Sequence, residues 1–71
     1  MGDGEQRRLV QSVDRAFRIV ELLADAPRGL SLKETGARMG LAVQTVQGLL
    51  RTLEFHGMVV QSGRERPYEL G

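Results

Sequence analysis

Two short amphipathic segments joined by a tight turn, over residues 30–53, constrain the fold of this chain more than any other feature. Ser31 and Glu34 match a capping box, in which the serine hydroxyl accepts a hydrogen bond from an early helix N–H and the carboxylate accepts one from the N–H of the cap. The first helix of the pair is therefore expected to begin one residue after Ser31. It should end at Met39, because Gly40 suits the left-handed backbone position that commonly follows a helix.

The second segment of the pair is predicted to be a helix over about residues 43–55. Its apolar side chains are spaced by three and four positions and so share one face: Val46, Leu49, Leu50 and Leu53. Gly57 follows it as a stop signal, and the chain turns between the two helices at residues 40–42. Two amphipathic helices joined in this way have the pattern of a helix-turn-helix.

The segments on either side complete the expected fold. Ser12 is expected to cap an additional helix that precedes the pair. After the pair, residues 58–61 and 67–70 have the composition of strands, and the glycine-containing loop at 62–66 fits a hairpin. Residues 30–32 can add a very short strand. The sequence therefore predicts a mainly α protein with a small β-hairpin, in which three helices are followed by a two- or three-stranded wing: a winged helix-turn-helix.

Length and composition limit what such a chain can be. Seventy-one residues allow one small domain, and the absence of cysteine excludes a disulfide or a thiolate metal site. No apolar run approaches the roughly 20 residues that a membrane-spanning helix needs, so no membrane partner is expected. Residues 1–10 are predicted to be a flexible arm or a cloning remnant, and residues 11–71 to form the domain.

Three runs of residues in this order resemble a known family. Residues 12–41 read SVDRAFRIVELLADAPRGLSLKETGARMGL, residues 45–61 read TVQGLLRTLEFHGMVVQ, and residues 68–71 read YELG. Together they are similar to the amino-terminal DNA-binding domain of the IclR family of bacterial transcriptional regulators, over nearly the whole chain.

The resemblance implies a dimeric regulator that binds double-stranded operator DNA and works in the cytoplasm, associated with the nucleoid. Family members carry a larger carboxy-terminal domain that binds a small-molecule effector and supports oligomerisation. That domain is absent from this chain, so an effector is expected to act only through it. The chain is interpreted as an isolated DNA-binding domain or a fragment of a longer regulator.

In a helix-turn-helix, the amino-terminal turns of the recognition helix lie against base edges in the major groove. The residues at this position are Val43, Gln44, Thr45, Gln47 and Gly48. The glutamine amides can make bidentate contacts with adenine, and Val43 can touch a thymine methyl. Thr45 can bind a phosphate. The alternative is that the two glutamines are ordinary uncharged surface amides.

Arg51, one turn further along this helix, can bind the DNA backbone as a positioning contact. The sequence departs from the family pattern nearby, since Val43 and Gly48 stand where cations are frequent. Two phosphate-binding charges are therefore missing. Gly36 also replaces a larger residue in the preceding helix.

Other candidate DNA contacts lie in the wing and at the start of the helix before the turn. Arg64 and Arg66 flank Glu65 in the wing loop, where arginines can approach phosphates or the minor groove. Ser31 and Lys33 open a helix whose amino terminus can bind a phosphate. The alternative for the wing loop is a simple solvent-exposed turn, and the net charge of +1 gives only weak support for nucleic acid.

The first helix has an apolar arc that is too wide for one core contact. Val13 and Phe17 are expected on its core face, with Ile19 at the edge and Leu22 on the far side. A second apolar surface on so small a domain suggests a partner. Phe17, Ile19 and Leu22 are therefore predicted to support dimerisation.

Catalytic residues are not indicated by this sequence. His56 is the single histidine, and no nucleophile, acid pair, metal-ligand set or phosphate-binding glycine loop accompanies it. The chain is therefore predicted to have no catalytic residue, no metal and no cofactor. Two functions remain: a duplex-DNA reader acting as a dimer, and a winged-helix module for protein–protein interaction with little or no DNA binding.

Overall fold

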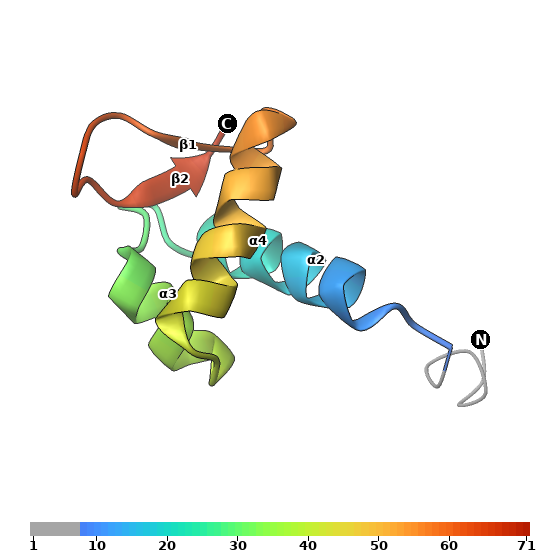
Figure 1. Ribbon diagram of the computed structural model, residues 1–71. Coiled ribbons are helices and arrows are strands. Elements are labelled where there is room, and N and C mark those ends of the chain that lie inside the picture. Colours follow the sequence, from blue (N-terminus) through green and yellow to red (C-terminus); the bar gives the residue numbers. More distant parts are fainter. Residues whose placement is uncertain (1–7) are drawn as a thin grey trace.

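The computed structural model describes residues 8–71. Three helices are followed by an antiparallel hairpin: α2 (Gln11–Ala24), α3 (Leu32–Met39), α4 (Val43–Phe55), β1 (Val59–Gln61) and β2 (Tyr68–Leu70). α4 crosses the front of the molecule in Figure 1, with α3 and the hairpin beside it and one end of α2 projecting away. The predicted winged helix-turn-helix is confirmed. Most of the expected arm, residues 1–7, lies outside the described residues.

The capping box at the start of α3 is confirmed. The Glu34 N–H donates to Ser31 Oγ at 3.0 Å, and the Ser31 N–H donates to Glu34 Oε1 at 2.9 Å. Hydrogen bonding of the Glu34 carboxyl, first to the Ser31 backbone N–H and then to the Ser31 side chain, lowers the pKa of this carboxyl. The box fixes the direction in which the chain enters the helix-turn-helix.

The turn between α3 and α4 depends on two glycines. Gly40 adopts φ 67°, the left-handed conformation expected after a helix. Gly36 is buried, and its carbonyl accepts a hydrogen bond from the Leu41 N–H at 3.1 Å. A Cβ at Gly36 would lie 3.2 Å from the Leu41 carbonyl oxygen. The small residue in α3 therefore lets the turn fold closely back onto the helix.

The first helix differs from its prediction at both its start and its core face. It begins at Gln11 with Val10 as N-cap, so Ser12 lies inside the first turn and caps nothing. Val13 and Phe17, expected on the core face, are 52% and 62% exposed, whereas Ile19 is fully buried. The first half of α2 extends beyond the other helices (Figure 1), so Val13 and Phe17 are only partly covered, although Phe17 borders an apolar pocket with His56 and Met58 at the end of α4.

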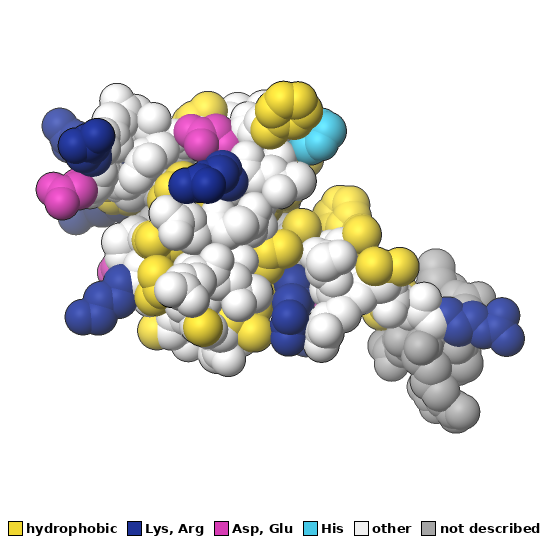
Figure 2. Space-filling model, viewed as in Figure 1, with side chains coloured by type: hydrophobic (Ala, Val, Ile, Leu, Met, Phe, Trp, Pro, Cys, Tyr) yellow, Lys and Arg dark blue, Asp and Glu magenta, His cyan; other side chains and the backbone are white. Residues whose placement is uncertain are grey.

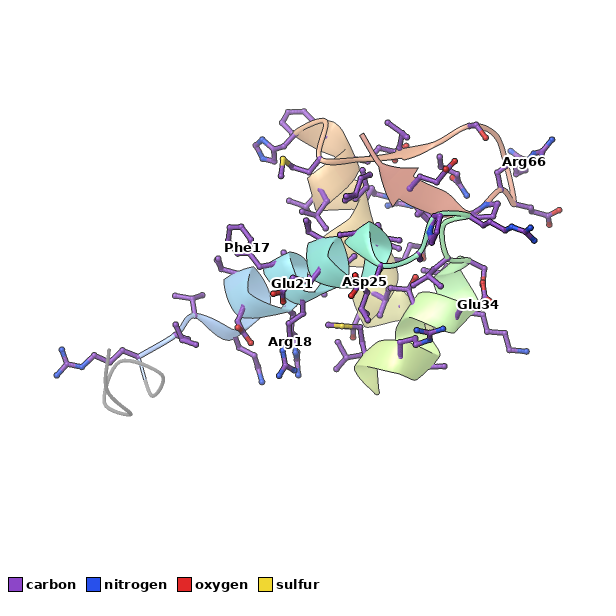
Figure 3. All side chains as sticks on the ribbon, turned by 180° about the vertical axis from the view of Figure 1, so that it is seen from behind. Phe17, Arg18, Glu21, Asp25, Glu34 and Arg66 are labelled. Atoms are coloured by element: carbon purple, nitrogen blue, oxygen red, sulfur yellow. The ribbon has the colours of Figure 1, made fainter. Side chains whose placement is uncertain are left out.

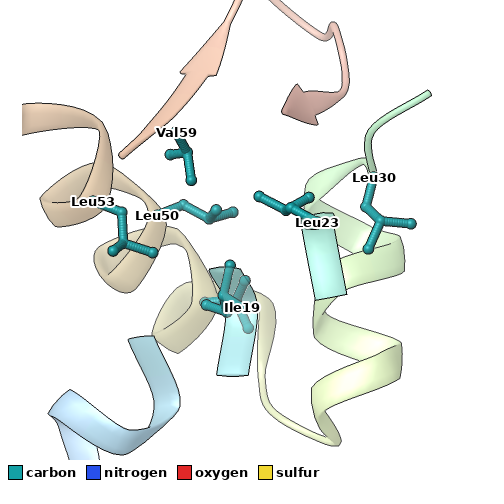
Figure 4. Close-up of a cluster of buried hydrophobic side chains, with 7 residues drawn as sticks. Ile19, Leu23, Leu30, Leu50, Leu53 and Val59 are labelled. Carbon is teal, nitrogen blue, oxygen red and sulfur yellow. The ribbon is translucent and has the colours of Figure 1, made fainter. Parts of the chain in front are cut away.

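The core lies where α2, α4, β1 and the segment before α3 meet (Figure 4). Its fully or nearly buried members are Ile19, Leu23, Leu30, Val46, Leu50, Leu53 and Val59. Thr35 is also buried, and its hydroxyl donates to the Ser31 carbonyl at 2.8 Å, so the polar atom is satisfied. One contiguous apolar cluster thus holds all the elements together.

The wing has two strands and one further pairing residue. β1 pairs with β2 in the register Val59 with Leu70, Val60 with Glu69 and Gln61 with Tyr68. Leu30 forms an isolated antiparallel bridge to Tyr68, with N···O distances of 3.0 and 2.8 Å. This bridge ties the start of the helix-turn-helix to the wing, so the two are positioned together.

The pKa of Glu34 gives a pH-dependent test of the capping box. Because the folded-state pKa is lowered, ionised Glu34 stabilises the fold above its ordinary pKa, and this contribution is lost as pH falls through the lower folded value. Ser31→Ala removes the serine hydroxyl but keeps the backbone N–H that donates to Glu34. The Glu34 pKa should therefore rise only part of the way to its ordinary value, while loss of the N-cap should lower the free energy of unfolding by about 1 kcal/mol. Carboxyl NMR titration and urea unfolding measure the two effects; a variant with an unchanged unfolding free energy and an unchanged Glu34 titration would contradict the assignment.

Candidate nucleic-acid interface

A groove lies between the start of α3, the middle of α4 and the wing loop. It is lined by Ser31, Leu32, Lys33, Gln47, Gln61, Arg64, Glu65, Arg66 and Tyr68. Five of these residues are candidate DNA contacts from the sequence, and they come from three elements that are far apart in the chain. The fold thus gathers them around one concave surface that is rimmed by cations.

The exposed face of α4 presents the other candidates. Val43, Gln44, Thr45, Gly48 and Arg51 are all exposed. The N-cap, Ala42, offers no side-chain hydrogen bond. A Cβ at Gly48 would meet no heavy atom within 4 Å, so this position is an open, flat part of the helix. No other element within residues 8–71 covers this face.

The charge on this side of the molecule is distributed unevenly. Figure 2 shows a front with few charges: Lys and Arg side chains lie at its margins and toward the wing, and one more lies over α4 with an acidic side chain beside it. The candidate cations Lys33, Arg51, Arg64 and Arg66 are all exposed. The start of α4 is thus uncharged, and positive charges lie further along α4, on α3 and in the wing loop.

The wing loop is held by two hydrogen bonds. Gln61 Nε2 donates to the Arg66 carbonyl at 2.8 Å, and the Arg66 N–H donates to the Gly63 carbonyl at 3.1 Å. These contacts support Arg64 and Arg66 in the loop. Gln61 was not singled out from the sequence, although a side-chain amide at the end of a strand, next to a loop, is a common partner for loop carbonyls.

Three residues were predicted to support dimerisation, and the burial of Ile19 contradicts this role for Ile19. It is 0% exposed inside its own domain and cannot contact a partner. Residues two positions apart on a helix point about 160° away from each other, so burying Ile19 turns Phe17 outward. Leu22 is half-buried and packs against the core. Phe17 alone of the three is a large exposed side chain.

Phe17 belongs to a wider apolar strip on α2 and the segment before it. We call this the α2 apolar strip: Leu9, Val10, Val13 and Phe17, which are between 52% and 63% exposed. Figure 3 shows Phe17 and Arg18 leaving α2 on opposite sides. Exposed apolar residues that cluster in this way indicate a contact surface.

The single histidine lies at the carboxy-terminal end of α4. His56 is exposed and stacks edge-to-face on Phe55, with ring centroids 5.1 Å apart. Among residues 8–71, no group of three or more His, Cys, Asp or Glu side chains is placed to hold a metal ion. Within the same residues, no helix is both long and apolar enough to cross a bilayer.

Comparison with known proteins assigns the family. Residues 12–63 match the IclR helix-turn-helix domain. The chain belongs to the IclR helix-turn-helix domain family. It is a DNA-binding domain that acts in transcription regulation, as the resemblance to the IclR family predicts.

Similar regulators occur in several bacteria. This chain is 41% identical over 64 residues to the glycerol operon regulatory protein of Streptomyces coelicolor; the aligned region covers 90% of this chain and 25% of that protein. It is 40% identical over 62 residues to the transcriptional regulator Rv1719 of Mycobacterium tuberculosis (87% and 24%), and 35% identical over 63 residues to XynR of Escherichia coli (89% and 25%). The chain thus spans about a quarter of the length of these relatives.

The contact assignments predict two different mutational effects. If these amides read bases, Gln44→Ala combined with Gln47→Ala should reduce discrimination between the best and a mismatched duplex roughly tenfold. Arg64→Ala should instead weaken binding to all duplexes alike and reduce the salt slope by about one. Fluorescence anisotropy on matched and mismatched duplexes measures both effects. If both variants keep wild-type affinity and preference, the assignment is wrong.

Proposed function

We propose that this domain reads a specific operator with α4 in the major groove and the wing on the adjacent backbone or minor groove. The observation that supports this most is the groove in which Lys33, Gln47, Arg64 and Arg66 converge from three elements. Phosphate contacts orient a protein on the duplex, while contacts to base edges select sequence. Cations at the margins and amides in the centre match this division.

In the proposed complex the base-reading contacts come from Val43, Gln44 and Gln47. A glutamine amide donates and accepts at the same time, which matches the edge of adenine, and a valine methyl suits thymine. Thr45, Ser31 and Lys33 bind phosphates at two helix starts. Gly48 has no side chain, so it lets the DNA approach the helix backbone closely.

The operator is proposed to be read by a dimer. The α2 apolar strip is the surface for this contact, since Phe17 and Val13 project from a helix whose opposite side is fixed in the core. Dimeric helix-turn-helix proteins place two recognition helices about one helical turn of DNA apart. Each half-site then needs only the contacts of one domain.

The longer relatives suggest the setting of the domain. We infer a transcriptional regulator in which residues 11–71 bind DNA, residues 1–10 precede the domain as an arm, and a further domain binds a small-molecule effector. The domain itself is proposed to act by binding rather than by catalysis, without a cofactor. Because its partner is operator DNA, its place is the cytoplasm, at the nucleoid.

A second function is favoured by a separate observation. Phe55 is 84% exposed and Met58 45% exposed near the end of α4, and the α4 face has few cations. An apolar surface of this kind also suits protein–protein association. Salt dependence separates the two functions, because phosphate contacts release counterions and make DNA affinity fall steeply with salt.

The proposed function is tested by in-vitro selection from random duplexes. The chain is fused to a dimerising coiled coil, so that a weak natural dimer does not prevent binding. We expect an enriched inverted repeat whose affinity falls at least tenfold between low and physiological salt. No enrichment together with no salt-sensitive binding would favour the protein-interaction module.

The dimer surface is tested separately in the unfused chain on the selected operator. Phe17→Asp should raise the dimer dissociation constant roughly tenfold or more, because a charge replaces a large apolar contact. Val60→Asp is the matched control, since it places the same charge on an exposed apolar residue of β1, outside the α2 apolar strip and the end of α4. Sedimentation velocity measures both variants; a dimer dissociation constant that Phe17→Asp leaves unchanged, or raises no more than Val60→Asp does, would remove Phe17 from the interface.

A further inference from the structure

The tip of the wing places an acidic residue in an unfavourable backbone conformation. Glu65 has φ 65°, and among residues 8–71 it is the only non-glycine residue with a left-handed backbone conformation. This conformation costs free energy for a residue with a Cβ, and a long acidic side chain has no special tolerance for it. The loop contains Gly63, but the left-handed position is at Glu65 instead.

The surrounding hydrogen bonds hold Glu65 in this position. The Arg66 N–H donates to the Gly63 carbonyl and so closes a turn that contains Glu65. The Arg66 carbonyl in turn accepts a hydrogen bond from Gln61 Nε2. Strained residues persist where the surrounding structure over-determines them, and they are frequent at functional sites. The backbone therefore presents the Glu65 side chain on the wall of the groove that it shares with Lys33 and Gln47.

Glu65 does not neutralise the neighbouring arginines through an ion pair. Among residues 8–71, the one ion pair lies on α2, where Arg18 Nε is 3.7 Å from Asp14 Oδ2. Glu65 forms no ion pair with a described residue. Glu65, Arg64 and Arg66 are all exposed. The carboxylate is thus free to accept hydrogen bonds from a ligand in the groove, at a point where a DNA-binding surface would otherwise exclude negative charge.

We propose that Glu65 makes the wing select G·C base pairs, by accepting a hydrogen bond from the guanine N2 amino group in the minor groove. This inference rests on the proposed function, in which the wing lies beside the minor groove. An ionised carboxylate only accepts hydrogen bonds, and the guanine amino group is the donor that the minor groove offers. A·T pairs present only acceptors there and leave the carboxylate without a partner.

The two arginines on either side strengthen this selection. Arginine in a minor groove favours the narrow, strongly negative grooves of A-tracts. A carboxylate between Arg64 and Arg66 is repelled by the same potential, so it opposes that preference. Glu65 therefore acts as a specificity-determining residue, which rejects A·T flanks as well as accepting from guanine.

The experiment uses the coiled-coil fusion and duplexes that keep the selected core half-site while the flank under the wing is varied. The wild-type chain should bind a G·C flank about fivefold more tightly than an A·T flank. Inosine in place of guanine removes only the N2 amino group and should abolish the advantage. Diaminopurine in place of adenine adds that group and should restore it.

Two variants and one control assign the effect to Glu65. Glu65→Gly removes the acceptor and should lose the discrimination between guanine and inosine while the core preference is unchanged, without the risk of misfolding, because glycine adopts the left-handed conformation readily. Glu65→Gln removes the negative charge but keeps a carbonyl oxygen that accepts from the guanine amino group, so it should keep this discrimination and bind A·T flanks more tightly than the wild type. Glu21→Gln changes the net charge by the same amount on α2, away from the wing loop (Figure 3), and should behave as wild type.

The outcomes separate the two proposals. Binding to the core half-site with equal affinity for guanine and inosine flanks overturns the role of Glu65 and leaves the proposed function intact. An unchanged preference for guanine over inosine in Glu65→Gly also overturns it. Failure of every protein to select a core half-site refutes the proposed function, and with it this inference.

Discussion

The packing of α4 against α2 is the contact on which the rest of the domain depends. Val46, Leu50 and Leu53 are buried beside Ile19, with Val59 closing the cluster from the wing. Because a helix has 3.6 residues per turn, fixing this stripe inside turns the stripe with Gln44, Gln47 and Arg51 outward. The same cluster anchors β1, so one apolar contact sets both the reading face and the position of the wing.

The parts of the fold that local signals determine could be predicted from the sequence. The capping box at Ser31, the stop at Gly40 and the spacing in α4 each depend on residues within one turn, and all three are confirmed. The core face of α2 could not be predicted. Periodicity shows that the helix is apolar over a wide arc, but only the position of α4 decides that Ile19 rather than Phe17 enters the core.

The candidate interface shows the same limit. Its residue types were visible in the sequence, whereas their convergence on one groove depends on the bridge between Leu30 and Tyr68, which joins α3 to the wing. The glycine in the wing loop indicates a turn, but it does not show which residue takes the left-handed position. That position is at Glu65, between Gly63 and Arg66, which are joined by a backbone hydrogen bond, while Gln61 holds the Arg66 carbonyl.

The distribution of charge links the proposed contacts to the proposed dimer. With a net charge of +1 and a single cation, Arg51, on the outward face of α4, one domain gains little from phosphate attraction, which usually supplies most nonspecific affinity. In the proposed complex, specificity would then depend on amides, methyl groups and the wing. Two domains joined through α2, as proposed, would bind a second half-site at high effective concentration, so that modest contacts multiply. In that dimer the exposed Phe17 would provide the binding strength that the cation-poor α4 lacks.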